Sequence, residues 1–231
     1  ERKFTNKLKL GIASGCFYKL FVPKDTNKII ESLKPFLLKH NITHLELTLA
    51  MVQDLELIFS ALNYQFLKEI ETSLHFPFKI LVQDNTEMRK VFNQISRIYH
   101  EIGSQFIIIH PEQIIDLDFL FEMRDKHKME IVTEIEVPSR ISLDDFESFL
   151  TKSKLKFVFD TGHAEFYPVQ RIKEFLHKFE HKICSVHANK MTNNKAHSSF
   201  YSSQISPTLE LVKHLPVPFI IEEVFEPEQV N

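Results

Sequence analysis

Short apolar runs alternate with longer amphipathic stretches along the chain, and this alternation restricts the fold more than any other feature of the sequence. The apolar runs predict strands at residues 8–13, 43–49, 72–76, 105–109, 130–137, 156–159, 183–187 and 217–224. The amphipathic stretches predict helices at residues 27–39, 52–71, 86–102, 117–127, 142–151, 169–179 and 207–214. A strand–helix unit that recurs about every 28 residues is typical of a (β/α)8 TIM barrel. We therefore expect a single α/β domain that spans residues 1–231.

A doubly wound open sheet is the other architecture that the alternation allows. Such a sheet usually begins with a glycine-rich turn, and residues 8–20 contain no G-x-G-x-x-G motif, which favours the barrel. The end of the chain departs from a complete barrel, because residues 225–231 are too few for an eighth helix. The last helix is therefore expected to be missing or truncated, and a homodimer is expected to bury the apolar seam between the first and last strands.

Composition narrows the class of protein. The chain has 231 residues, 43% of them hydrophobic, and a net charge of −3, so its overall charge does not indicate a nucleic-acid or membrane partner. No apolar stretch is long enough to span a bilayer, and the sequence shows no signal-peptide pattern. The two cysteines, Cys16 and Cys184, are too few for a disulfide framework. These features predict a cytoplasmic protein with reduced thiols.

Most of the predicted strands end in a side chain that can bind a metal. In chain order these residues are Glu46, His75, His110, Glu134, Glu136, Asp160, His163, His187, Glu222 and Glu223. The active site of a TIM barrel lies at the carboxyl ends of its strands, so this fold would gather these side chains in one cleft. The simpler interpretation is a set of unrelated polar residues at solvent-facing strand tips. Because several follow strongly apolar runs, such as Phe-Ile-Ile-Ile before His110, the pattern favours a divalent-metal site.

The segment DTGHA at residues 160–164 is the most informative of these strand ends. It follows an apolar run, and a carboxylate at the end of a buried strand costs on the order of several kcal/mol unless a partner compensates its charge. Gly162 would let the backbone turn so that Asp160 and His163 converge on one point. The simpler alternative is a strand that ends in an Asx-turn, because Asp and Gly are common turn residues.

Six segments carry a resemblance to a known group of proteins. They are HFPF at 75–78, HPEQ at 110–113, EVPSR at 136–140, DTGHA at 160–164, VHANK at 186–190 and IIEE at 220–223. With these segments in this order, the chain resembles the xylose isomerase-like superfamily of TIM barrels, which contains sugar isomerases and epimerases and also endonuclease IV. The resemblance implies a central metal set of Glu136, Asp160, His187 and Glu222. It also implies that Glu136 and Glu222 form an acid/base pair and that His163 contacts substrate.

The endonuclease IV pattern matches further positions. It implies that His75, His110 and Glu136 bind one metal, and that His163 and His197 are two ligands of a third. An aspartate usually completes that third site, two residues before the second of its histidines, and this chain has Lys195 there. The match to the third metal is therefore incomplete.

The leading hypothesis is a divalent-metal-dependent isomerase or epimerase of a small sugar, sugar phosphate or hydroxy-ketone. A Mn²⁺, Mg²⁺ or Zn²⁺ ion would polarise the carbonyl group, and Glu136 and Glu222 would move the proton of the neighbouring C–H group. The candidate substrate-binding residues are His163, His75 and Lys190. The epimerases usually have an arginine six residues after the histidine of the seventh strand, and this chain has Asn193 there, so their substrate contacts do not transfer directly.

Two other classes of function stay open. An endonuclease IV-like, zinc-dependent hydrolase of phosphodiesters at abasic DNA is favoured by His75, His110 and the aromatic residue Phe78, and is opposed by Lys195 and by the net charge of −3. Nucleic acid would be a partner only under this alternative. The third class is a barrel that keeps the site but serves as a binding or scaffold protein, because fold alone is poor evidence of function.

Two further carboxylates receive supporting roles. Glu134 shares a strand face with Glu136, and we interpret it as a deeper barrel residue for which Lys156 is a candidate partner. Glu46 is a candidate for orienting a ligand histidine from behind.

Overall fold

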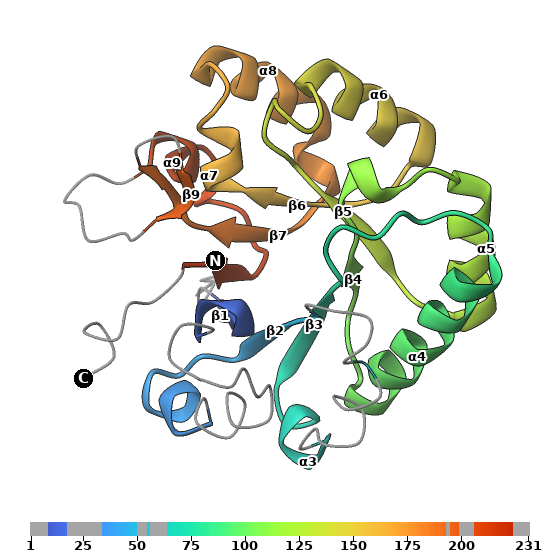
Figure 1. Cartoon of the computed structure of the whole chain (residues 1–231). Coiled ribbons are helices and arrows are strands. Elements are labelled where there is room, and N and C mark those ends of the chain that lie inside the picture. Colours follow the sequence, from blue (N-terminus) through green and yellow to red (C-terminus); the bar gives the residue numbers. More distant parts are fainter. Residues whose placement is uncertain are drawn as a thin grey trace, which may run out of the picture.

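A closed barrel of eight parallel strands forms the centre of the molecule (Figure 1). The structure is a computed structural model that describes residues 9–17, 34–49, 55, 64–192, 195–198 and 206–223. The barrel strands are β1 (Leu10–Ala13), β2 (His44–Thr48), β3 (Glu71–His75), β4 (Ile107–Ile108), β5 (Ile131–Glu134), β6 (Phe157–Asp160), β7 (Ile183–Ala188) and β10 (Phe219–Ile221). Their order around the barrel is β1-β10-β7-β6-β5-β4-β3-β2, which confirms the predicted TIM barrel.

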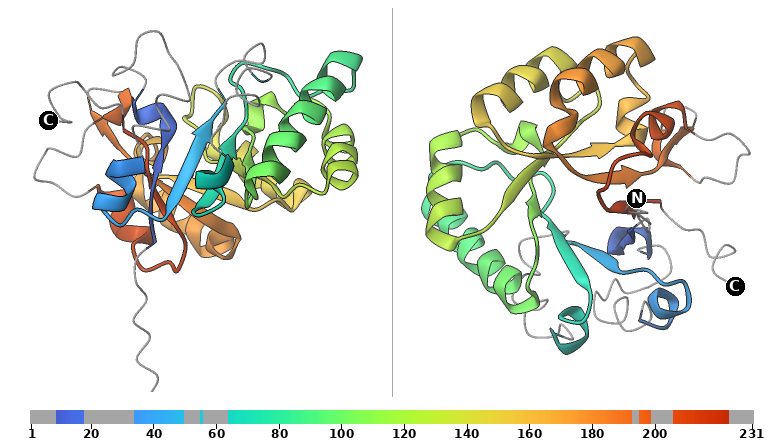
Figure 2. Two further views of the ribbon diagram at one scale, coloured as in Figure 1. Left: turned by 90° about the horizontal axis from the view of Figure 1, so that it is seen from below. Right: turned by 180° about the vertical axis from the view of Figure 1, so that it is seen from behind.

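Helices surround the barrel, and α4, α5, α6 and α8 form most of the described outer layer (Figures 1 and 2). The α-helices are α3 (Tyr64–Leu67), α4 (Thr86–Ile102), α5 (Leu117–His127), α6 (Leu143–Ser153), α7 (Thr161–Ala164), α8 (Val169–Phe179) and α9 (Pro207–Val212). Short 3₁₀ helices are η1 (Ser14–Phe17), η3 (Pro111–Gln113) and η4 (Glu180–Lys182). Residues 34–39 are also helical.

Helix α4 shows how local sequence sets these elements. It begins after Asn85, whose side chain accepts a hydrogen bond from the backbone N–H of Met88 at 2.8 Å. It ends at Gly103, which adopts φ 69°, a left-handed conformation that glycine takes at little cost. Both ends agree with the predicted helix at residues 86–102.

The apolar core lies between the barrel and its helices. A large cluster joins the α4 and α5 side of the molecule to β1–β4, and a second joins α6, α8 and α9 to β6 and β7. Rings of Phe146, Phe157 and Phe175 pack in the second cluster with centroids 5.5–5.9 Å apart. These contacts hold the strands rigidly, and their carboxyl ends therefore form a fixed platform for functional side chains.

Two predicted elements differ from the structure. The helix predicted at 52–71 ends by Leu67 in the described residues, and Glu71 begins β3 because it pairs in register with His44 of β2. The segment 188–206, in which the sequence predicted neither a strand nor a helix, contains the antiparallel pair β8 (Lys190–Thr192) and β9 (Lys195–Ser198). These strands are short and polar, so hydrophobic periodicity gives no signal for them.

The seam between the first and last strands is a direct strand pair, in which Leu10 lies opposite Phe219. The predicted absence of a final helix concerns residues 224–231, which lie outside the described residues. The homodimer across this seam stays a prediction. Among the described residues, no helix has both the length and the apolar character needed to cross a bilayer.

Candidate metal centre

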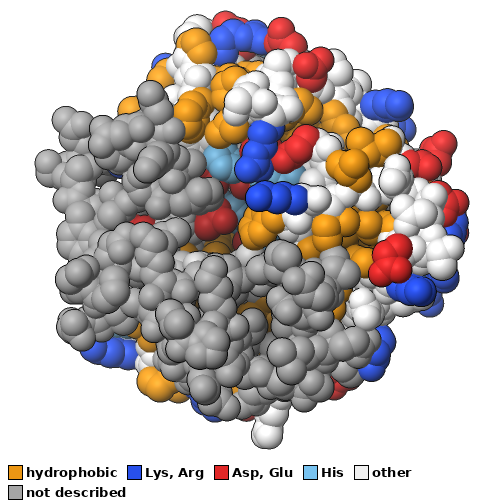
Figure 3. Space-filling model, in the orientation of Figure 1, with side chains coloured by type: hydrophobic (Ala, Val, Ile, Leu, Met, Phe, Trp, Pro, Cys, Tyr) orange, Lys and Arg blue, Asp and Glu red, His pale blue; other side chains and the backbone are white. Residues whose placement is uncertain are grey.

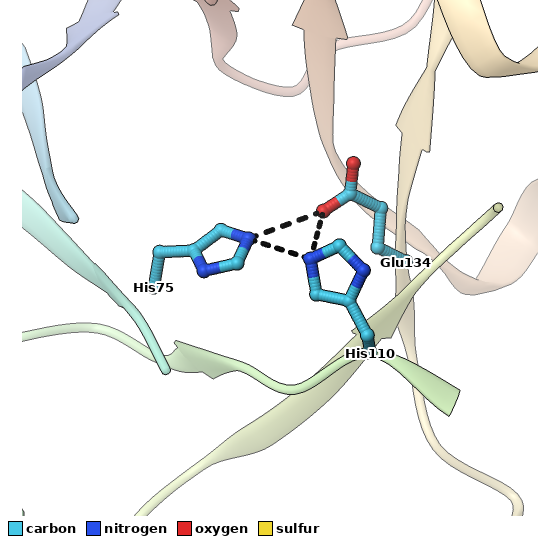
Figure 4. Close-up of side chains that lie close together, drawn as sticks. All are labelled: His75, His110 and Glu134. Carbon is cyan, nitrogen blue, oxygen red and sulfur yellow. Dashed lines mark hydrogen bonds and ion pairs between the residues drawn. The ribbon is translucent and has the colours of Figure 1, made fainter. Parts of the chain in front are cut away.

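Three groups of potential metal ligands lie close together in the described residues, and two of them share the carboxylate of Glu134. We call these two the histidine-pair cluster and the His187 cluster. The histidine-pair cluster consists of His75, His110 and Glu134, and the His187 cluster consists of Glu134, Asp160, His187 and Glu222. In each cluster the ligand atoms lie within 4.8 Å of one another. Figure 4 shows the histidine-pair cluster, in which the three side chains converge from different strands.

The two histidines of the first cluster face each other through their Nε2 atoms, which lie 2.9 Å apart. His75 Nδ1 lies 3.0 Å from the carbonyl oxygen of Phe76 and must donate to it, because a carbonyl only accepts. His110 Nδ1 contacts the carboxylate of Glu136 and donates to it for the same reason. Each neutral ring therefore presents a lone pair at Nε2. Two lone pairs at this distance require a proton or a metal ion between them.

Glu134 completes this cluster from below. Its Oε2 lies 3.7 Å from His75 Nε2 and 3.9 Å from His110 Nε2. That oxygen is buried and accepts no hydrogen bond from the described residues, which is costly for a carboxylate in an interior. A divalent cation among these three atoms would compensate the cost.

The His187 cluster is richer in carboxylates. His187 Nδ1 lies 3.0 Å from Glu222, 3.2 Å from Glu134 and 3.9 Å from Asp160, measured to the nearest carboxylate oxygen. Ligands about 2.1 Å from one shared ion are separated by roughly 3.0–4.2 Å, depending on the angle between them, so these spacings suit a single divalent ion. One neutral imidazole nitrogen and three carboxylates form a hard, mostly oxygen donor set that fits Mn²⁺, Mg²⁺ or Zn²⁺.

The electrostatics of the clusters follow from burial and from this charge imbalance. Burial opposes the charged form of His187, but the carboxylates of Glu46, Glu134 and Glu222 outweigh it and raise its pKa well above the usual value. Burial likewise opposes charge on His75, yet Glu134 raises its pKa. Burial lowers the pKa of His110 to about 3. In the absence of metal, protons on His75 and His187 therefore balance part of the negative charge.

Asp160 is held in place through both of its oxygens. Its Oδ1 accepts from the backbone N–H of His163 at 2.6 Å and caps helix α7, so the Asx-type turn is present. Its Oδ2 accepts from the side-chain amide of Asn189 at 2.6 Å. Gly162 makes room for that amide, because a Cβ there would lie 1.7 Å from Asn189 Oδ1. The glycine is thus required by close approach, a reason that the sequence did not reveal, and Asn189 was not among the predicted site residues.

A pocket of about 200 Å³ opens onto the clusters. Its lining includes His75, His110, Glu134, His163 and Glu222, together with Gly15, Cys16, Thr48, Phe78, Arg140 and Glu223. In Figure 3, histidine surfaces lie at the bottom of a hollow near the centre of the face, with basic and acidic side chains beside it. The site is therefore accessible to a small molecule.

Glu136 lies outside the His187 cluster. The structure brings Asp160, His187 and Glu222 together as expected, but Glu134 takes the fourth place, and Lys156 pairs with Glu130 instead. Both glutamates of the segment face inward, and strand alternation does not reveal which one lies at the level of the cluster. Glu134 ends β5 opposite Val158, two residues below Asp160, and its side chain reaches the ligand set.

Glu136 contacts His110 Nδ1 and the guanidinium of Arg140, which donates to it at 3.0 Å. Arg140 also donates to Glu112 at 3.2 Å. A carboxylate that holds the far nitrogen of a ligand histidine fixes the orientation of its ring. Glu136 therefore occupies an orienting position behind His110, and its own group of potential ligands is His110, Glu112 and Glu136.

The remaining predicted residues are placed as follows. His163 lines the pocket, and its Nδ1 donates to the carbonyl oxygen of Ile135 at 2.9 Å. Lys190 begins β8 and is not among the pocket-lining residues of the described chain. His197 lies in β9, but the position of its side chain is outside what the structure describes. Glu46 lies 3.1 Å from His187 Nε2, in the orienting position that the sequence suggested.

Comparison with known proteins gives a consistent result for the fold. No protein-family model matches the sequence, and no curated protein matches it significantly. Solved structures do match. A 3-keto-D-glucoside 4-epimerase, YcjR, from E. coli has a TM-score of 0.58 at 14% identity, covering 96% of this chain and 95% of that chain.

A xylose isomerase domain-containing protein from Salmonella typhimurium has a TM-score of 0.66 at 14% identity, covering 94% of this chain and 88% of that chain. The TTHB071 protein of Thermus thermophilus, soaked with ZnCl₂, has a TM-score of 0.63 at 14% identity, covering 96% and 94%. The structural neighbours are thus xylose isomerase-like TIM barrel proteins, and at these identities the likeness shows a shared fold.

Proposed function

We propose that this protein is a divalent-metal-dependent isomerase or epimerase of a small sugar or hydroxy-ketone. The observation that carries the proposal is the position of Glu134 and Glu222. Both line the pocket, and both belong to the His187 cluster. Two carboxylates that face one small cavity next to a cation site suit proton transfer at a carbon beside a carbonyl group. The fold shared with a sugar epimerase supports the same class.

The chemistry needs little beyond these residues. A bound Mn²⁺, Mg²⁺ or Zn²⁺ ion would be held by the His187 cluster and would polarise the carbonyl of the substrate. Glu134 and Glu222, which extend from strands β5 and β10, are the candidates to remove the proton and to return it. His163 lines the same pocket and is the candidate to bind a substrate hydroxyl.

Proton exchange tests the proposal without knowledge of the true substrate. Metal-loaded protein incubated in D₂O with a panel of ketoses and small hydroxy-ketones should incorporate deuterium next to the carbonyl of an accepted compound. The E222Q variant should lose this exchange, by ~10²–10⁴-fold if Glu222 is the general base. The isomerase class would be contradicted if the wild-type protein bound a divalent ion but incorporated deuterium into no compound of the panel, whether loaded with Mn²⁺, Mg²⁺ or Zn²⁺.

A second function is favoured by one specific observation, the histidine-pair cluster. A second ligand set that shares Glu134 with the first would hold two ions side by side, as in enzymes that hydrolyse phosphodiesters with two metals. This supports the alternative of a zinc-dependent phosphodiester hydrolase that acts on abasic DNA. Phe78, whose ring centroid lies 4.8 Å from that of His75, would face such a substrate at the pocket mouth.

Metal counting and one assay separate the two functions. Elemental analysis that finds one ion per chain, lost in H187A and retained in H75A, would favour the isomerase. Two or more zinc ions per chain, together with cleavage of an oligonucleotide that contains a single abasic position, would favour the hydrolase. An undamaged oligonucleotide of the same sequence is the control for nonspecific nuclease activity.

A further inference from the structure

A line of buried polar side chains continues from the His187 cluster down through the interior of the barrel. It consists of His187, Glu46, Ser73 and His44, all with no exposed surface. His187 Nε2 lies 3.1 Å from Glu46 Oε2, the same oxygen lies 3.1 Å from Ser73 Oγ, and Ser73 Oγ lies 2.9 Å from His44 Nε2. Buried polar side chains are costly unless they are hydrogen-bonded, and these three contacts join all four side chains, although His44 Nδ1 and Glu46 Oε1 have no hydrogen-bond partner among the described residues.

The directions of these hydrogen bonds follow from one group. A carboxylate oxygen accepts, so both His187 Nε2 and Ser73 Oγ donate to Glu46 Oε2. The Ser73 hydroxyl donates its one hydrogen to Glu46, so its oxygen must accept the hydrogen bond from His44 Nε2. Every hydrogen in the line is thereby assigned, and they all point toward Glu46.

This assignment decides which nitrogen of His187 is available to a cation. In the neutral ring that a metal ion requires, the proton on Nε2 leaves Nδ1 with its lone pair, and Nδ1 is the atom that faces Glu134, Glu222 and Asp160. Those three carboxylates are themselves acceptors, and they favour the opposite tautomer, with the proton on Nδ1. Glu46 is the group that opposes them from below.

We infer that Glu46 and Ser73 are positioning residues that hold His187 with its proton on Nε2, so that Nδ1 can bind the metal ion. The inference rests on the proposed metal-dependent function. Glu46 contacts the ligand directly, and Ser73 acts through Glu46 by fixing the orientation of its carboxylate. His44 donates to Ser73 from the far end, where its Nδ1 lies 3.7 Å from Glu71 Oε2, and Lys9 pairs with the other oxygen of that carboxylate.

The variant E46Q tests this with almost no change in volume. A glutamine keeps the hydrogen-bonding shape, and its carbonyl oxygen can take the place of Oε2, but it removes the negative charge that favours the proton on His187 Nε2. We expect E46Q to weaken Zn²⁺ binding at the His187 cluster by about 10–100-fold, the usual effect of losing the partner of a ligand histidine. S73A should have a smaller effect of the same sign. Calorimetric titration with Zn²⁺ measures both.

A matched control is available on the same strand. Thr72 adjoins Ser73, is equally buried, and its Oγ1 makes no hydrogen bond with the described residues. T72V should therefore leave Zn²⁺ affinity within about twofold of the wild type, the error expected for a site without coupling. If T72V lost as much Zn²⁺ affinity as S73A, a general disturbance of the barrel would explain both losses, and the inference would be overturned.

A spectroscopic measurement separates positioning from stability. In zinc-loaded wild-type protein, ¹⁵N spectra of His187 should show a metal-bound Nδ1 and a proton on Nε2 that is hydrogen-bonded to a carboxylate. S73A should shift that proton and T72V should not, whatever happens to thermal stability. If E46Q fails to fold, S73A still decides the question by the same spectrum.

The failures are distinguishable. Wild-type affinity in E46Q and S73A, or a His187 that binds zinc through Nε2, would overturn the positioning role while leaving the metal site in place. Absence of any divalent-ion binding by the wild-type protein would contradict the proposed function itself and the inference with it.

Discussion

The barrel interior contains two polar regions that differ in one respect. Below, around Ser73, the hydrogen bonds run in one direction: His44 Nε2 donates to Ser73 Oγ, and Ser73 Oγ donates to Glu46 Oε2. Above, in the His187 cluster and the histidine-pair cluster, acceptor atoms converge on one another. Both regions are buried, and both would count as unusual on composition alone. The difference teaches that buried polarity does not mark a metal site by itself. A group of imidazole nitrogens and carboxylate oxygens that lie within 4.8 Å of one another does.

The largest effect is expected where the two clusters overlap. E134Q removes one negative charge from both clusters and places an N–H group among acceptors. We expect loss of divalent-ion binding by at least about 100-fold, greater than the 10–100-fold typical of residues that only orient a ligand. Elemental analysis and Zn²⁺ calorimetry measure it. If E134Q kept the metal content of the wild type, Glu134 would not be required for metal binding in either cluster.

The other glutamate of the same segment sharpens the comparison. Glu136 contacts His110 Nδ1 from the side away from the histidine-pair cluster. E136Q should therefore weaken only the binding that depends on His110, by about 10–100-fold, and should leave the His187 cluster unaffected. H110A is the reference variant for the same ion. If E136Q instead removes the ion held by His187, Glu136 is a direct ligand there, as the resemblance to known enzymes first implied.

A third test concerns the scaffold of Asp160. G162A introduces a Cβ that would lie 1.7 Å from Asn189 Oδ1, so the amide that donates to Asp160 must move. Overpacking of this kind costs about 1–3 kcal/mol of unfolding free energy. G103A is the matched control: nothing lies within 4 Å of a Cβ there, and its cost, about 1 kcal/mol, arises only from φ 69°. Denaturant unfolding compares the two, and metal affinity should fall in G162A alone.

The sequence predicted the fold because local patterns of apolar and polar residues determine the strands and helices of the barrel. Helix α4 shows this well, since the amphipathic stretch predicted a helix at residues 86–102 and the structure has it at Thr86–Ile102. The sequence also predicted that five side chains would lie close together, because each follows the end of a strand and parallel strands end at one face of the barrel. These side chains are His75, His110, Asp160, His187 and Glu222. That reasoning needs only the order of strands and their direction.

The sequence did not predict two kinds of feature. One is the level of a side chain along the barrel axis, and the other is contact between segments that are distant in sequence. Strand alternation gave Glu134 and Glu136 the same face, but only the pairing of Glu134 with Val158 shows that Glu134 lies two residues below the level of Asp160. The pairing of Asn189 with Asp160 spans 29 positions in sequence, and no local pattern reveals it. The β8–β9 hairpin was missed for a different reason, because its strands lack an apolar face.

The last prediction concerns protons, and it tests whether the upper region does hold acceptors that await a cation. Carboxylates raise the pKa of His187 well above its usual value and also raise that of His75, whereas burial lowers that of His110 to about 3. A raised folded-state pKa means that protonation stabilises the metal-free fold. This contribution is fully present below the unfolded value of about 6.5 and is lost as pH rises through the folded value.

A metal ion must displace these protons, so the metal affinity has the opposite dependence and rises with pH, by about tenfold per pH unit for each proton released. Zn²⁺ calorimetry between about pH 6 and 8, in buffers of different ionisation enthalpy, counts the protons. H187N should release fewer protons than the wild type, and H110N should release the same number, because His110 carries none. An affinity that does not change with pH would show that His187 and His75 are already neutral, and the two polar regions of the barrel would then differ less than their geometry indicates.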